Sequence, residues 1–188
     1  MALQRQDVPW SYEDLRALPD DGKRYEIIEG ELFELTGPNL FHATAVSNLV
    51  VLLLPFVQAL GGRLYPAVFD LFLPGAEPVE PDIAILLPSN PARKTVRGIE
   101  GPPDIVIEVL SPSNRTHDLL TKRAIYQRGG VREYWIADPE GRTLEVVSFV
   151  GGTYRSRTLV GDDVVASDVL PGVAFPASAV FAGMDGIE

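Results

Sequence analysis

The chain has 188 residues, no cysteine, 16 basic and 26 acidic residues, and a formal net charge of −10. Its apolar content of 46% is enough for a buried core and excludes a disordered chain. The lack of cysteine excludes a disulfide scaffold, a thiolate zinc site and cysteine catalysis. It also fits a reducing compartment, so we expect a cytoplasmic protein. The length predicts one domain over residues 1–188.

The chain as a whole is too acidic for a general nucleic-acid coat, because phosphate binding needs cations. Residues 93–132, however, contain eight basic and four acidic residues, whereas the segments on either side are acidic. This basic segment is either a phosphate-binding face or a set of solvated charges. The most apolar stretch, 45–60, is shorter than a bilayer span and contains Pro55, so we expect no membrane partner.

Hydrophobic periodicity predicts helices and strands in the first half of the chain. The expected elements are a helix over 11–17 capped by Ser11, a hairpin over 24–35 turning at Gly30, a long apolar helix over 39–60 that Pro55 kinks or divides, strands over 64–73 and 82–87, and a loop-rich stretch over 88–103.

Hydrophobic periodicity also predicts helices and strands in the second half of the chain. The expected elements are a strand over 104–110, a helix over 116–128 ended by Gly129–Gly130, strands over 133–137 and 144–149, a hairpin over 154–160 and 164–169, and a short helix over 175–181. A helix between strands 104–110 and 133–137 allows a right-handed parallel crossover. These elements predict an α/β or α+β fold with a central sheet. We divide it into an N-terminal helix and hairpin (11–35), a core (39–149) and a C-terminal hairpin and tail (150–188).

Three carboxylates interrupt apolar strands: Asp70 in VFDLFL, Asp82 in PDIAILL and Glu108 in DIVIEVL. Burying a charge is costly unless it is paired or holds a metal ion. A single such residue favours a solvent-facing or arginine-paired role, but three on successive strands favour a cation site. Alternation sets Glu108 on the same strand face as Val106 and Leu110.

Lys122 follows on the next predicted helix, with Asp118 and Tyr126 one turn away on either side. It either forms a surface pair with Asp118, worth about 0.3–0.5 kcal/mol, or lies beside the carboxylates and neutralises charge in a transition state. Carboxylates binding Mg²⁺, with Mn²⁺ as the alternative, suit phosphodiester hydrolysis when a lysine assists. Zinc is the weaker choice, because the chain has two histidines, and we expect His42 to cap a helix or border the core.

Several segments, in this order, resemble the Uma-two-like restriction endonuclease family of the PD-(D/E)xK nuclease superfamily. The matching segments are LPDDGKRYEIIEGEL (18–32), FHATAVSNLVVLL (41–53), VFDLFLPG (68–75), VEPDIAIL (79–86), VLPGVAF (169–175) and, most specifically, the block over 101–147.

The resemblance implies a restriction-endonuclease-like core, a mixed sheet flanked by helices. It implies that Asp82 is the acid of the PD motif and Glu108 the second acid, with the Val109 carbonyl completing the metal coordination. The superfamily's lysine would stand at position 110, which is leucine here, so the resemblance moves that role to Lys122.

Two further acids have open roles. Glu26 is either an additional catalytic acid or a solvent-facing hairpin residue. Asp70 shares the metal or fixes Lys122. Tyr126 is expected to pack in the core, and Trp135 to pack there or to join the long helix in a dimer interface.

The leading hypothesis is a Mg²⁺-dependent DNA endonuclease, acting as a homodimer, with Arg97, Arg115 and Arg123 as DNA contacts. The alternatives are a non-catalytic nucleic-acid- or protein-binding module that keeps the fold, and a phosphoesterase acting on a small molecule. A groove lined by arginines favours DNA, whereas a closed pocket favours a small molecule.

Overall fold

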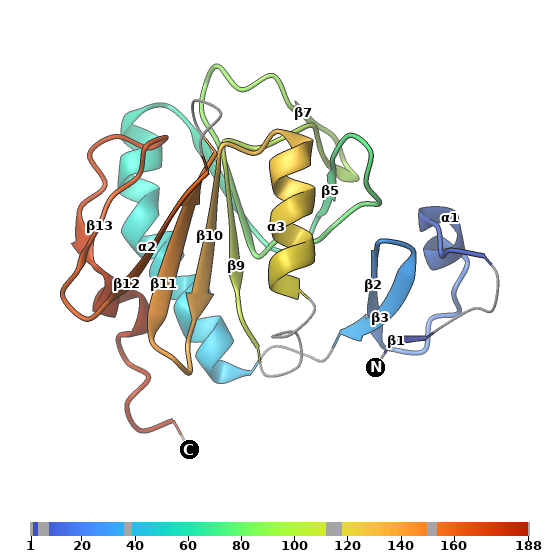
Figure 1. Ribbon diagram of the computed structural model, residues 1–188, viewed down its shortest axis with the longest axis horizontal. Coiled ribbons are helices and arrows are strands. Elements are labelled where there is room, and N and C mark those ends of the chain that lie inside the picture. Colours follow the sequence, from blue (N-terminus) through green and yellow to red (C-terminus); the bar gives the residue numbers. More distant parts are fainter. Residues whose placement is uncertain (1, 4–7, 36–38, 112–117, 150–153, 188) are drawn as a thin grey trace.

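A six-stranded mixed sheet forms the centre of the computed structural model, which describes residues 2–3, 8–35, 39–111, 118–149 and 154–187 (Figure 1). Its strands in spatial order are β12 (Arg155–Val160), β11 (Thr143–Ser148), β10 (Glu133–Asp138), β9 (Ile105–Val109), β6 (Ile83–Leu86) and β4 (Arg63–Pro66). The predicted α+β class and the central sheet are confirmed.

The predicted crossover joins β9 to β10 through α3 (Asp118–Gly129). β9 and β10 are parallel, and Ile107 is the register partner of Trp135. Every residue of β9 is buried, because this apolar strand lies inside the sheet and both of its faces are covered. The chain turns after α3 at Gly130, whose φ of 91° favours glycine.

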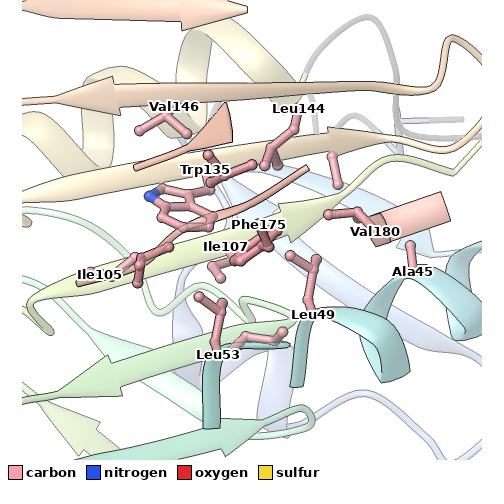
Figure 2. Packing of buried hydrophobic residues seen from close by; sticks show 14 of the residues in the cluster. Ala45, Leu49, Leu53, Ile105, Ile107, Trp135, Leu144, Val146, Phe175 and Val180 are labelled. Carbon is pink, nitrogen blue, oxygen red and sulfur yellow. The ribbon is translucent and has the colours of Figure 1, made fainter. Parts of the chain in front are cut away.

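The long helix α2 (Leu40–Ala59) covers one face of the sheet. Every fourth residue from Ala45 to Val57 is buried, and these side chains meet the odd-numbered residues of β9 (Figure 2). Trp135 is fully buried in this cluster, so it is a core residue and cannot contribute to a dimer interface. α2 is one helix through Pro55, so of the two predicted effects of this proline, a kink or a division, the division is excluded.

α2 is long and apolar enough to cross a membrane, with a mean hydropathy of 2.0 over its best window. This is a property of length and composition alone. The buried residues of α2 form one stripe that packs against the sheet, as in a core helix. Core helices of soluble proteins also have the length and hydropathy of a membrane span.

The other face of the sheet packs against α3 and a small sheet of β5 (Asp70–Phe72), β8 (Gly98–Glu100) and β7 (Arg93–Lys94). One prediction is wrong here. The strand expected over 64–73 is two strands in different sheets, because β4 pairs with β6 and β5 pairs with β8. The stretch 88–103, predicted to be loop-rich, also contains the short strands β7 and β8.

The N-terminal segment forms a separate small sheet of β1 (Ala2–Leu3), β3 (Glu31–Leu35) and β2 (Arg24–Ile28), with α1 (Tyr12–Arg16) beside it. Ser11 and Asp14 form a capping box at the start of α1, which confirms the predicted cap. In Figure 1 this unit lies beside α3, at the edge of the molecule.

The C-terminal prediction is partly wrong. β12 pairs with β11 rather than with the segment that follows it, while β13 (Val164–Val165) pairs with β14 (Phe175–Pro176). The closing helix is the 3-10 helix η2 (Ala177–Phe181), which packs against α2. The C-terminal segment thus completes the core on the α2 face.

Candidate active site

Asp82 and Glu108 come from neighbouring antiparallel strands. Ile83 of β6 is the register partner of Ile107 of β9. Continuing the register by one residue sets Asp82 opposite Glu108, and both positions alternate onto the face covered by α3. Directly opposed residues have Cβ atoms about 4.5–5.5 Å apart. Two acids that β6, β7 and β8 separate in the sequence therefore meet at the carboxyl end of β9.

Glu108 is buried and lies between two donors on successive turns of α3. Its Oε1 accepts hydrogen bonds from Lys122 Nζ at 3.2 Å and from the Tyr126 hydroxyl at 2.5 Å. Burial, and then the adjacent Glu108 carboxylate, hold the pKa of Tyr126 well above its usual value, so the hydroxyl stays protonated and donates. Glu108 is therefore neither solvent-facing nor on an edge strand.

Lys122 joins this carboxylate to the N-terminal hairpin. Its Nζ lies 3.2 Å from Oε2 of Glu26 on β2, and both side chains are 3% exposed. The other oxygen of Glu26 accepts the main-chain N–H of Glu80 at 3.1 Å. Of the two open roles for Glu26, the solvent-facing one is therefore excluded.

Asp82 immediately precedes β6, and both of its carboxylate oxygens have partners. Oδ2 accepts the main-chain N–H of Val109 at 2.7 Å, and Oδ1 lies 3.0 Å from Nε2 of His42. His42 is in the first turn of α2, where Asn39 caps the helix by accepting the His42 N–H. α2 and α3 thus contribute side chains to the same end of the sheet from opposite faces.

Asp70 begins β5 in the smaller sheet. Its Oδ2 accepts the Tyr12 hydroxyl at 2.5 Å, and burial, then this hydrogen bond, raise the pKa of Tyr12. The guanidinium of Arg97 lies over the rings of Tyr12 and Phe72, at 5.4 and 4.9 Å from the centroids. These contacts attach α1 of the N-terminal unit to β5 of the smaller sheet.

Of the other arginines considered as DNA contacts, those that the structure describes do not stack on aromatic rings of the N-terminal unit as Arg97 does. Arg123 is partly buried, pairs with Glu145 at 2.7 Å and contacts the Tyr154 hydroxyl. Arg115 lies outside the described residues. Arg93, which would line an arginine-rich groove, pairs with Glu100 at 3.1 Å and is otherwise exposed.

The donor set of the site suits a hard cation with few protein ligands. Within the described part of the chain, no group of three or more His, Asp or Glu side chains is close enough to hold a metal ion by itself. Mg²⁺ usually binds through one or two carboxylates, keeping waters and substrate oxygens as its other ligands. Asp82 and Glu108, with a main-chain carbonyl such as that of Val109, match this requirement.

Several contacts of the site were not predicted from the sequence, among them the pairing of Glu26 with Lys122. Tyr126 was expected to pack only, although its spacing of four residues from Lys122 was the signal that both reach one partner. His42 was expected at a cap or core border, and no local pattern indicates its contact with Asp82.

Comparison with known proteins identifies the family. The family model Uma2, described as "Putative restriction endonuclease", matches residues 12–178. The chain belongs to the Uma2 family. A crystal structure entitled as that of "a putative nuclease belonging to DUF820" from Anabaena variabilis superposes with a TM-score of 0.75 at 19% identity, covering 92% of this chain and 98% of that one. No match was found among curated proteins. The restriction-endonuclease-like fold predicted from the sequence is thus confirmed.

Proposed function

We propose that this protein is a divalent-metal-dependent endonuclease that hydrolyses DNA phosphodiester bonds at Asp82 and Glu108. The observation that carries the proposal is the buried charge cluster at the end of β9. The ammonium of Lys122 pairs with the carboxylates of Glu26 and Glu108, and Asp82 lies opposite Glu108 on the neighbouring strand. An excess of negative charge in a partly buried site favours a bound cation.

Each residue has a separate task in this proposal. Asp82 and Glu108 hold Mg²⁺, or Mn²⁺ in its place, with the Val109 carbonyl as a further oxygen donor. The bound cation supplies acidification of a water molecule and neutralisation of phosphate charge. Lys122, 3% exposed, holds Glu108 in place through an ion pair that a low-dielectric environment strengthens. Glu26 keeps Lys122 directed at that carboxylate from the opposite side.

The position of Arg97 supports a nucleic-acid substrate. Its side chain is exposed, and stacking on Tyr12 and Phe72 orders the guanidinium before a phosphate arrives. We propose that Arg97 contacts the DNA backbone, with Arg115 and Arg123 as further contacts. A homodimer, which brings two sites to two strands, is part of the same proposal.

A plasmid-nicking assay tests the proposal. The wild-type protein should convert supercoiled plasmid to nicked and linear forms with Mg²⁺ or Mn²⁺, and EDTA should stop the reaction. Asp82→Asn and Glu108→Gln should abolish nicking, while Glu34→Gln, which alters an exposed pair with Lys23, should leave it unchanged. Undiminished cleavage by either site variant rejects the assignment. A folded wild-type protein that cuts nothing but binds DNA supports a non-catalytic module instead.

A further inference from the structure

We infer that His42 is a positioning residue for the cation site, acting through Asp82. The inference rests on the proposed function, because it assigns a task toward the cation that Asp82 is proposed to bind. The observation is the 3.0 Å contact between His42 Nε2 and Asp82 Oδ1. The partners are 13% and 17% exposed, so the contact lies at the border of the site rather than on the open surface.

Asp82 needs such a partner because it comes just before β6, where the regular ladder ends. Its main-chain carbonyl accepts the N–H of Ala67 at 2.7 Å, which fixes the backbone. The side chain is still able to rotate about its own bonds. The Val109 N–H holds Oδ2 and the His42 imidazole holds Oδ1, so the plane of the carboxylate is fixed by two donors from different elements.

His42 is itself held firmly enough for this task. The side chain of Asn39 accepts the His42 N–H at 2.9 Å and caps α2 at that turn. Further along α2, Asn48 donates from Nδ2 to the main-chain oxygens of Val180 and Ala182. The helix that carries the imidazole is thus attached to η2 as well as to the sheet.

A carboxylate fixed in its binding orientation loses less conformational freedom when a cation arrives. Outer partners that orient metal-binding residues typically contribute 10- to 100-fold in affinity. The role requires a hydrogen-bond donor near Oδ1, and does not require an imidazole as such. A glutamine at position 42 retains a donor of comparable reach, whereas an alanine does not.

Equilibrium binding of Mn²⁺, followed by electron paramagnetic resonance of the free ion without DNA, tests the inference. His42→Ala should weaken Mn²⁺ binding by about 10- to 100-fold, and His42→Gln should recover most of the loss. Ser47→Ala is the matched control, because it changes an exposed side chain of the same helix that has no part in holding His42 or Asp82, and it should leave affinity unchanged. Thermal melting establishes that each variant is folded.

The outcomes separate this inference from the proposed function. Wild-type affinity in His42→Ala overturns the positioning role. Equal losses in His42→Gln and His42→Ala also overturn it, because the donor alone is then not what matters. If Ser47→Ala loses as much as His42→Ala, the effect belongs to α2 in general and the inference fails. A folded wild-type protein that binds no Mn²⁺ rejects the proposed cation site itself.

Discussion

Lys122 on α3 and Glu26 on the N-terminal hairpin form a buried ion pair, with Nζ and Oε2 3.2 Å apart. The same ammonium pairs with Glu108 at 3.2 Å. A small unit at the edge of the molecule therefore supplies part of the charge cluster at the end of the central sheet. Removing the ammonium should cost more stability than removing one of the carboxylates, because the single cation compensates two anions.

Lys122→Met should destabilise the protein far more than Glu26→Gln. Removing the ammonium leaves two buried carboxylates facing each other, which costs about 3–5 kcal/mol. Removing the Glu26 charge leaves Lys122 paired with Glu108, and glutamine keeps an oxygen acceptor, so we expect a cost of at most about 1.5 kcal/mol. Urea unfolding at pH 7 measures both. Equal costs would contradict the shared-ammonium description.

Lys122 should also matter more for turnover than for DNA affinity. Lys122→Ala removes the residue that positions Glu108 but no exposed cation, since the side chain is 3% exposed. Single-turnover nicking rates should fall by orders of magnitude, while the DNA dissociation constant measured in Ca²⁺ changes by less than a few-fold. A loss confined to affinity would make Lys122 a phosphate contact.

Tyr126→Phe should cost about 1–3 kcal/mol of unfolding free energy, because a buried carboxylate oxygen loses a short hydrogen bond. The ring remains and its packing with Tyr134 is retained. Tyr25→Phe is the matched control, since that exposed hydroxyl donates to Asp21 and should change stability by less than about 0.5 kcal/mol. A silent Tyr126→Phe would show that Glu108 is held by other groups.

Glu133, the first residue of β10, should make the stability of the protein depend on pH. Burial raises the pKa of this carboxyl above 4.5, although Ser167, Trp135 and the Asp168 N–H donate to it and oppose the shift. The folded chain therefore binds more protons than the unfolded chain between the two pKa values, and this stabilising contribution falls as pH rises through that window.

The free energy of unfolding of the wild-type protein minus that of Glu133→Gln should accordingly fall from pH 4.5 to pH 7. Glu31→Gln, an exposed change on β3, should show no comparable trend. If the free energy of unfolding of the wild-type protein rises with pH relative to that of the variant, the sign derived from burial is contradicted.

Arg97→Ala should weaken DNA binding and reduce the slope of log K against log salt by roughly one phosphate contact. Arg97→Lys should recover part of the salt slope, but less of the affinity, because ammonium does not stack on Tyr12 and Phe72 as guanidinium does. Arg157→Ala on β12 serves as the control. An unchanged slope would remove Arg97 from the DNA-binding surface.

Local pattern predicted the strands that carry the site. The apolar run of DIVIEVL predicted β9, and the helix ended by glycine between two strands allowed a parallel crossover to β10; the structure has both. These features depend on residues close together in the sequence. They could be predicted because burial on both faces leaves a continuous apolar run.

Pairings between distant segments were not accessible in the same way. An alternating stretch over 64–73 has the same pattern whether it forms one strand or two, and only its partners β6 and β8 divide it. The contacts of Glu26 with Lys122 and of His42 with Asp82 likewise depend on where the hairpin and α2 dock. Charge and spacing within one segment do not contain that information.

A crystal structure with Mn²⁺, located by its anomalous scattering, tests the central claim most directly. The account predicts a peak within coordination distance of both carboxylates, Asp82 and Glu108, that disappears in Glu108→Gln crystals grown and soaked in the same way. A peak bound elsewhere, or no peak in crystals of the wild-type protein at saturating Mn²⁺, would contradict it.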